Sequence, residues 1–128
     1  MKKGFTLLEL IIVIIIIGIL GSLGFVQYTR MVERGRTAEG KDILGQIRTS
    51  QEGYKQEYGA YTASMGALAI DVPATCTATH YFTFTSSASA GTATRCTGAT
   101  GKTPAGPAAY QIIIDYATGA WSGSPGYY

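Results

Sequence analysis

The chain has 128 residues, which is enough for a single domain with a modest core. Hydrophobic residues make up 46% of it and charged residues only 14%, a balance typical of a chain with a membrane segment or an unusually large core. The 10 basic and 8 acidic side chains give a net charge of only +2. Two of the basic residues are Lys2 and Lys3 at the N-terminus, so basic and acidic side chains are balanced in the rest of the chain. This balance argues against a nucleic-acid-binding protein.

The segment from Phe5 to Phe25 is long and apolar enough to cross a bilayer once. As a helix it would extend about 30 Å, and Leu, Ile, Val and Phe occupy most of its positions. Glu9 is its only strongly polar side chain. The summed gain from the apolar residues, about 0.3 to 0.6 kcal/mol each, exceeds the cost of about 3 kcal/mol for one acidic group. The segment is therefore predicted to insert into a membrane while it carries one unsatisfied carboxylate.

Two simpler interpretations of this segment remain as alternatives. A secretory signal peptide would explain the two lysines before an apolar run, with a cleavage site at residues 22–24. The length of the run and the acidic residue inside it argue against a signal peptide. A generic membrane anchor leaves Glu9 without a role, whereas an ionisable residue within a membrane segment usually has a functional partner.

The residues around Glu9 resemble a known family. The stretch Lys2-Lys3-Gly4-Phe5-Thr6-Leu7-Leu8-Glu9-Leu10 is similar to the leader and processing motif of type IV prepilins. The resemblance implies that a prepilin peptidase cleaves between Gly4 and Phe5 and methylates the new amino group of Phe5. It also implies that Glu9 forms a salt bridge with the N-terminal amine of Phe5 in a neighbouring subunit. Such a pair is physically reasonable, because a charge buried in an apolar filament core is costly unless an opposite charge neutralises it.

The same resemblance implies a location and a set of partners. The precursor would reside in the inner membrane, and the mature subunit in an extracellular pilus at the cell surface. The expected partners are other copies of the chain in a helical filament, the prepilin peptidase, and the pilus assembly platform with its ATPase. No nucleic acid is expected. The specific part of the resemblance ends in the stretch Glu57–Tyr61.

Three glycines, Gly18, Gly21 and Gly24, interrupt the end of the apolar run, where many members of the family have a proline and this chain has Val26. Each costs about 1 kcal/mol relative to alanine inside a helix. One hypothesis is that they allow this part of the helix to melt or bend during assembly. The alternative is that these small residues pack closely against neighbouring helices.

Residues 29–58 are predicted to continue the helix as an amphipathic segment. No proline interrupts them, and a set of mostly apolar residues recurs at spacings of three and four, which places the set on one helix face. That face consists of Gly40, Leu44, Ile47, Gln51, Tyr54 and Tyr58. Since helix propensity alone does not hold such a segment, this face is predicted to pack on a sheet. Gly59 is the expected end of the helix.

The remainder is predicted to form a small β domain. Residues 59–79 are an irregular connection with a short turn from Ser64 to Leu68. Strands are predicted at Tyr81–Thr85, at Tyr110–Tyr116 and near Ala120–Ser122, where aromatic and β-branched residues gather. Alternation places one set of side chains on the sheet face toward the helix: Tyr110, Ile112, Ile114 and Tyr116.

The predicted fold class is therefore α+β, with a long N-terminal helix packed on a small antiparallel sheet. The predicted organisation is a leader at 1–4, a membrane-spanning and filament-core helix at 5–28, an amphipathic helix at 29–58, a connection at 59–79 and a β head with a C-terminal tail at 80–128.

Cys76 and Cys96 are the only cysteines and belong to no metal-type cluster, so a disulfide between them is predicted to stabilise the head by about 3 kcal/mol. Many pilins have a bridge nearer the C-terminus, which puts in doubt whether the C-terminal segment is closed in the same way here. Residues 75–103, rich in Ser and Thr, are predicted to be an exposed loop, and residues 123–128 a mobile end.

No motif predicts an enzyme, a metal site or a cofactor. His80 is the sole histidine, and Asp71 and Asp115 are the only acidic residues of the head, which provides neither a zinc set nor a calcium cluster. The predicted function is that of a structural subunit of an extracellular type IV pilus-like filament, cleaved and N-methylated before assembly. The alternatives are a pseudopilin of a type II secretion apparatus and a DNA-uptake or adhesive minor pilin.

Overall fold

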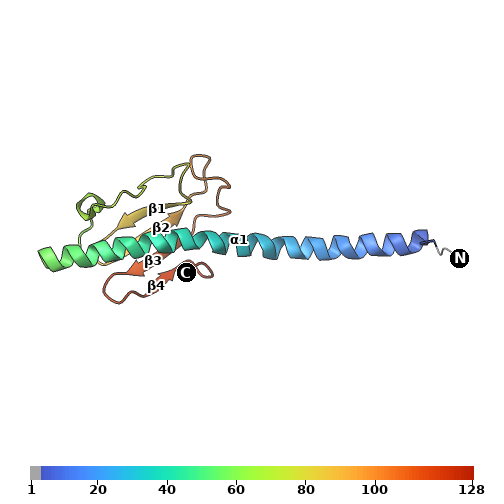
Figure 1. The fold of residues 1–128 in the computed structure, drawn as a ribbon, viewed down its shortest axis with the longest axis horizontal. Helices are drawn as coiled ribbons and strands as arrows, with labels where there is room; N and C mark the ends of the chain where they lie inside the picture. The colour runs from blue at the N-terminus through green and yellow to red at the C-terminus, as the bar shows by residue number, and fades with distance from the viewer. Residues whose placement is uncertain (1–3) are drawn as a thin grey trace. The chain divides into compact units, whose positions relative to one another are not determined.

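The computed structural model describes residues 4–128, and its longest element is helix α1, which runs from Leu7 to Tyr58 (Figure 1). Of the predicted leader, residues 1–3 lie outside the described part. Gly59 ends the helix with a φ of 82°, and its N–H donates to the carbonyl of Lys55 at 2.7 Å. A left-handed glycine with this hydrogen bond is a common helix terminator, so the predicted end at Gly59 is confirmed.

The chain divides into two units, Met1–Glu33 and Arg34–Tyr128. In the first unit the large apolar side chains of α1 are exposed from Leu7 to Met31. An 18-residue window of this helix has a mean hydropathy of 2.7, and none of the window is buried. The helix is thus long and apolar enough to cross a membrane, and its apolar surface is not consumed by a core within the chain.

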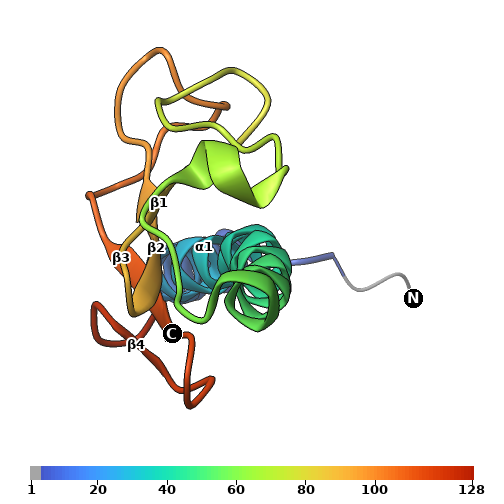
Figure 2. The same ribbon diagram turned by 90° about the vertical axis from the view of Figure 1, so that its left-hand side faces the viewer.

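The second unit contains a four-stranded antiparallel sheet beside the part of α1 that follows Arg34 (Figures 1 and 2). The strands are β1 (Phe82–Ser86), β2 (Ala90–Arg95), β3 (Gln111–Asp115) and β4 (Trp121–Gly123), in the spatial order β1-β2-β3-β4. Figure 2 shows the strands on one side of the helix. The α+β fold class, with one helix packed on a small antiparallel sheet, is confirmed.

Strand β2 corrects the prediction that residues 75–103 are an exposed loop. It pairs with β1 on one side and with β3 on the other, so it lies inside the sheet. Its residues alternate, with Gly91, Ala93 and Arg95 buried and Thr92 and Thr94 partly exposed. The sequence gives little sign of this strand, because small residues at the buried positions do not produce the usual apolar alternation.

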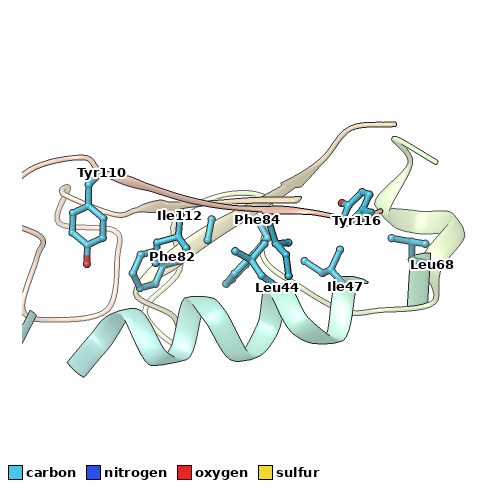
Figure 3. Close-up of a cluster of buried hydrophobic side chains, with 10 residues drawn as sticks. Leu44, Ile47, Leu68, Phe82, Phe84, Tyr110, Ile112 and Tyr116 are labelled. Atoms are coloured by element: carbon cyan, nitrogen blue, oxygen red, sulfur yellow. The ribbon is translucent and has the colours of Figure 1, made fainter. Parts of the chain in front are cut away.

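The core lies between α1 and the inner face of the sheet (Figure 3). Leu44 and Ile47 of α1 are fully buried, and they pack with Phe82 and Phe84 of β1. The four residues predicted to face inward lie in β3 or directly beside it, and all of them are buried: Tyr110, Ile112, Ile114 and Tyr116. The packed face of α1 is therefore confirmed, except at its end, where Tyr58 is 63% exposed and stacks on Tyr54 with ring centres 4.4 Å apart.

Gln51 occupies a fully buried position on this otherwise apolar face. Its Nε2 donates to the carbonyl of Thr62 at 2.6 Å and to Oγ of Ser86 at 2.8 Å, and its Oε1 accepts from the N–H of Thr62 at 3.0 Å. These bonds satisfy the buried amide. The start of the connection after Gly59 is thereby attached to both the helix and β1.

The connection itself contains a short 3₁₀ helix at Met65–Leu68, close to the predicted turn. Leu68 is buried and joins the core. Ser64 precedes this helix, but its side chain makes no capping hydrogen bond. Packing of Leu68, rather than a cap, therefore positions this turn.

The C-terminal segment is docked on the head, and the prediction of a mobile end is wrong. The ring of Tyr127 stacks on that of Tyr110 with centroids 3.8 Å apart and planes 9° apart. The N–H of Ser124 donates to the carbonyl of Gln111 at 2.8 Å, and the N–H of Gln111 donates to Oγ of Ser124 at 3.1 Å. Aromatic stacking and reciprocal hydrogen bonds therefore hold this end, which lies outside the loop that the disulfide closes.

Candidate functional site

The N-terminal segment begins α1 with a reciprocal pair of hydrogen-bonded side chains. Thr6 precedes the helix, and its carbonyl accepts the first helical bond from the N–H of Leu10 at 3.3 Å. Oγ1 of Thr6 accepts from the N–H of Glu9 at 3.2 Å, and Oε2 of Glu9 accepts from the N–H of Thr6 at 2.8 Å. The Thr6 hydroxyl also donates to the same carboxylate oxygen at 2.8 Å. This arrangement is a capping box, which satisfies two backbone donors at the start of the helix.

The capping role of Thr6 is the feature of this segment that the sequence analysis missed. The available signal was the spacing of a threonine and a glutamate three positions apart immediately before an apolar run, which is typical of a helix start. Loss of such a cap costs about 1 kcal/mol of helix stability. The same two residues therefore determine where the apolar helix begins.

The capping box also corrects the expectation that Glu9 is an unsatisfied carboxylate. Glu9 has two donors within its own chain, and both end on Oε2. The negative charge also lies in the first turn of α1, where the helix dipole favours it. Oε1 is not used by these two bonds, so the carboxylate can accept another donor while it keeps the cap.

The predicted cleavage site lies in the residues just before the helix. Gly4, Phe5 and Thr6 have no regular secondary structure, and the side chain of Phe5 is 86% exposed. A peptidase requires a non-helical, accessible main chain of this kind, because helical backbone groups are already engaged with one another. The geometry is compatible with cleavage between Gly4 and Phe5.

The three glycines of the apolar run lie within continuous helix. A side chain added at Gly18, Gly21 or Gly24 would meet no atom within 4 Å, apart from immediate neighbours and the local helix backbone. Their small size is thus not required by contacts within this chain. Both hypotheses, local melting and close packing against other helices, stay predictions about the assembled state.

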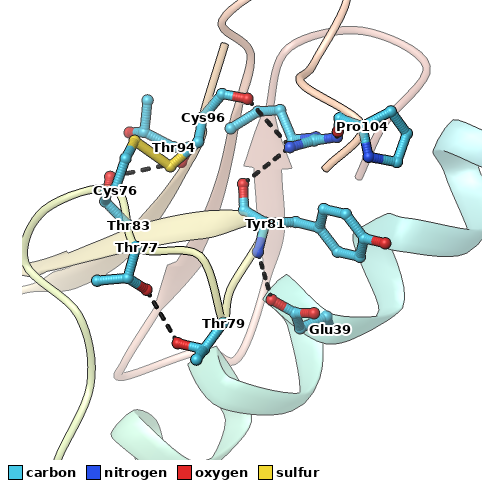
Figure 4. The surroundings of a disulfide bond; sticks show 10 residues. Glu39, Cys76, Thr77, Thr79, Tyr81, Thr83, Thr94, Cys96 and Pro104 are labelled. Carbon is cyan, nitrogen blue, oxygen red and sulfur yellow. Dashed lines mark hydrogen bonds between the residues drawn. A yellow bond between two sulfur atoms is a disulfide. The ribbon is translucent and has the colours of Figure 1, made fainter. Parts of the chain in front are cut away.

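The head contains a disulfide between Cys76 and Cys96, whose Cα atoms are 5.8 Å apart (Figure 4). The preceding residue, Arg95, is buried, and its Nη1 donates to the carbonyls of Tyr81 at 3.1 Å and Cys96 at 3.0 Å. Its Nη2 donates to the carbonyl of Pro104 at 3.0 Å. The disulfide and Arg95 thus connect the end of β2 with the segment that precedes β1 and with the segment that follows β2.

Helix α1 also contacts this region of the head. Oε1 of Glu39 accepts from the N–H of Tyr81 at 2.8 Å (Figure 4). Its Oε2 lies 3.6 Å from Nζ of Lys102. The Lys102 ammonium also lies 4.5 Å from the centre of the Tyr81 ring. These contacts are structural in kind, because they connect backbone segments and surround no reactive group.

Across residues 4–128, no group of three or more His, Cys, Asp or Glu side chains is placed to hold a metal ion. Nδ1 of His80 lies 2.8 Å from the hydroxyl of Thr79. Oδ1 of Asp115 accepts from the N–H and the hydroxyl of Thr118 at 2.7 and 2.8 Å. The hydrogen bond from the Thr118 N–H, followed by that from its hydroxyl, lowers the pKa of Asp115 below its ordinary value.

Comparison with known proteins identifies the N-terminal segment. Residues 1–25 match the family model described as the prokaryotic N-terminal methylation motif. The match includes Gly4, Phe5, Thr6 and Glu9. No curated protein and no solved structure matches the chain significantly. The recognised motif thus covers the cleavage region, the capping box and the apolar run as far as Phe25.

Proposed function

Residues 1–25 carry the N-terminal methylation motif of type IV pilins and pilin-like proteins, and from this premise we propose a function. The chain is the structural subunit of an extracellular pilus-like filament. One observation carries the proposal. The motif is continuous with a helix whose apolar side chains are exposed from Leu7 to Met31. A surface of this kind requires either lipid or other apolar helices to cover it.

Processing is the first step of the proposed function. A prepilin peptidase at the inner membrane cleaves between Gly4 and Phe5 and methylates the amine of Phe5. Cleavage removes Lys2 and Lys3, and the new amine of Phe5 then lies directly before the capping box. The mature subunit begins with a positive charge, a capped helix start and one carboxylate, all within five residues of sequence.

Assembly is the second step, driven by the platform and its ATPase. The apolar helix leaves the lipid and packs among copies of itself in a helical filament. In that environment the charge of Glu9 needs an opposite charge, and the Phe5 amine of a neighbouring subunit supplies one. Because the capping box uses Oε2, the neighbour's amine can approach Oε1 without disrupting the helix start.

The same motif occurs in pseudopilins, so a pseudopilin of a secretion apparatus is the competing assignment. The head favours the pilus subunit, because its two acidic residues are separate and Oδ1 of Asp115 is engaged by Thr118. Calcium, which some pseudopilins bind, requires several clustered oxygen ligands.

Mass spectrometry of filaments sheared from cells that produce this chain tests the proposal. The expected main species begins at N-methylated Phe5 and is two hydrogens lighter than the reduced chain because of the Cys76–Cys96 disulfide. A Glu9→Val strain is the matched control, with normal membrane insertion and little filament. A secreted monomer that begins near Phe25 would instead establish a signal peptide, and a chain that stays in the cell envelope and never enters sheared fibres would favour the pseudopilin.

A further inference from the structure

The sheet of the second unit has an outer face, opposite the core, that carries almost no charge. Strand pairing places two rows of side chains on it: Thr83, Thr94 and Gln111 in one row, and Thr85, Thr92, Ile113 and Ser122 in the other. We refer to these two rows as the outer sheet face. The charged residues of the four strands are Arg95, which is buried, and Asp115, which lies at the end of β3. Exposed surfaces of soluble domains usually carry charges of both signs.

The outer sheet face is open to other molecules. Within residues 4–128, no helix or strand lies over it (Figure 2). Thr85 and Ser122 are exposed, and Thr92 and Ile113 are partly exposed. Ile113 lies in the interior of the longer row, between Thr92 and Ser122. An apolar centre surrounded by uncharged polar groups is typical of a protein–protein contact surface.

The hydroxyl groups of this face are suited to an identical partner. Within the described part of the chain, the hydroxyls of Thr85, Thr92 and Ser122 take part in no hydrogen bond. A hydroxyl is both a donor and an acceptor, so it can form a hydrogen bond with the same hydroxyl of another copy. A carboxylate or an ammonium at these positions would instead meet a like charge.

We propose that the outer sheet face is a self-contact surface, which packs on the same face of a second copy of this chain. A two-fold contact brings each residue near its own equivalents. Such a contact therefore requires a face without charge whose polar groups can pair with themselves, and the outer sheet face meets both conditions. The two sheets would lie about 10 Å apart, the ordinary spacing of stacked sheets.

The size of the face determines how strong this contact is. Strands about 4.8 Å apart and about five residues long give a four-stranded face of roughly 300 Å². Two such faces bury less than the roughly 1,200 Å² at the low end of stable interfaces. One contact is therefore weak, and it becomes effective only where many copies are held close together, as in a membrane or along a fibre.

The self-contact goes beyond the proposed function. Successive subunits of a polar helical filament meet through two different surfaces, whereas a two-fold contact uses the same surface twice. In the assembled state it would therefore join subunits of neighbouring filaments, and before assembly it would join subunits in the membrane. The test below requires membrane insertion and does not depend on filament formation.

The test uses the full-length chain in liposomes and a bifunctional maleimide that spans about 10 Å. Ile113→Cys provides one reactive thiol in the outer sheet face, because both native cysteines are in the disulfide. Gln56→Cys places a thiol at an exposed position of α1 and measures random collisions. The expected result is at least about fivefold more cross-linked dimer for Ile113→Cys than for Gln56→Cys. Flotation checks that both chains are inserted, and circular dichroism that they are folded.

Charge substitutions identify the partner as the same face. In the Ile113→Cys background, Thr92→Lys and Thr92→Glu should each reduce the dimer at least about fivefold, because like charges then lie within about a Debye length of each other. Liposomes that contain both variants should recover the dimer as mixed pairs. Gln56→Lys and Gln56→Glu add the same charges outside the face and should leave cross-linking unchanged.

Equal dimer yields for Ile113→Cys and Gln56→Cys would overturn the self-contact. So would a loss in the Gln56 charge variants as large as that in the Thr92 variants, since general repulsion would then explain both. Failure of mixed Lys and Glu liposomes to recover the dimer would disprove the two-fold pairing. If no dimer forms but cells shed filaments that begin at Phe5, the inference fails while the proposed function stands. If the dimer forms but no filament is found, the proposed function fails and the self-contact stands.

Discussion

Thr6 and Glu9 cap each other at the start of α1, with the Thr6 N–H and hydroxyl both 2.8 Å from Oε2 of Glu9. The carboxylate proposed to meet a neighbour's amine is therefore also the residue that defines the helix start. One side chain performs a local structural role and, by our proposal, an intermolecular electrostatic role.

These two roles can be separated by substitution. Glu9→Gln retains an oxygen that can accept the capping bonds but removes the charge, and it should reduce filament yield at least about tenfold because the neighbour's amine is left buried without a partner. Thr6→Val keeps the charge and the shape of the side chain but removes the two hydroxyl bonds of the cap, at a cost of about 1 kcal/mol, and should reduce yield only modestly. Yield is measured in the sheared fraction, and insertion by alkaline extraction of membranes.

Glu9→Val is the reference for both substitutions, since it removes the carboxylate half of the cap together with the charge and should still insert. Equal filament yields for Glu9→Gln and the wild type would contradict the proposed salt bridge. A larger loss in Thr6→Val than in Glu9→Gln would show that the cap, and not the charge, is the essential property.

The glycines of the apolar run give a second prediction. Replacing Gly18, Gly21 and Gly24 together by alanine should stabilise the helix by about 1 kcal/mol per position. If local melting accompanies assembly, this variant inserts normally but forms fewer filaments, and a map of wild-type filaments shows interrupted helical density at these residues. Continuous helical density with glycines against neighbouring helices would support close packing instead.

The disulfide is expected to be a major source of head stability. It closes a loop between residues 20 positions apart, and in the chain-entropy model its loss costs about 3 kcal/mol. Cys76→Ala with Cys96→Ala should therefore lower the urea midpoint of the full chain in detergent, followed by the fluorescence of Trp121. Reductant should lower the wild-type midpoint by a similar amount and leave the double variant unchanged. A double variant as stable as the oxidised wild type would disprove this assignment.

Gly123 is required by the backbone at the end of β4. Its φ is 133°, and an added Cβ would overlap the carbonyl of Gln111. Gly123→Ala should destabilise the head by at least about 2 kcal/mol. Gly45→Ala is the matched control, because its Cβ would meet no atom within 4 Å in a helix and should stabilise by up to about 1 kcal/mol. The unfolding midpoint is expected to fall below that of the wild type in Gly123→Ala and to rise above it in Gly45→Ala.

Asp115 makes the stability of the head sensitive to acid. Its folded-state pKa is lowered, first by the hydrogen bond from the Thr118 N–H, then by the Thr118 hydroxyl and, more weakly, by the N–H of Ala117 and the Arg48 charge. Its stabilising contribution is therefore complete above the unfolded-state pKa of about 3.9 and is lost as pH falls through the lower folded-state value. Asp115→Asn should be less stable than the wild type at about pH 6, and the gap should narrow as pH falls below the unfolded-state pKa and through the lowered folded-state value.

The measurement is the urea midpoint of both chains across that pH range. Asp71→Asn removes one negative charge from an exposed position elsewhere on the head and controls for net charge. A gap between Asp115→Asn and the wild type that stays constant from neutral to acidic pH would contradict the role of the carboxylate.

The sequence by itself determined the parts of this protein that depend on neighbouring residues. The apolar run, the end of α1 at Gly59 and the packed face of Leu44 and Ile47 all follow from local composition and helical periodicity. The processing motif follows from the resemblance of residues 2–10 to type IV prepilins. The capping box was equally local, and its threonine and glutamate spacing was visible in the sequence. The inward face of Gln111–Asp115 followed from simple alternation.

Only the tertiary structure decided the features built from distant segments. Strand β2 exists because β1 and β3 pair with it on both sides, although its own small residues predict no strand. Arg95 is buried because carbonyls from three segments surround it, and the C-terminal end is ordered because Tyr127 meets Tyr110. Strand pairing, burial and ring stacking depend on which distant segments come into contact, and local patterns in the sequence do not predict those contacts.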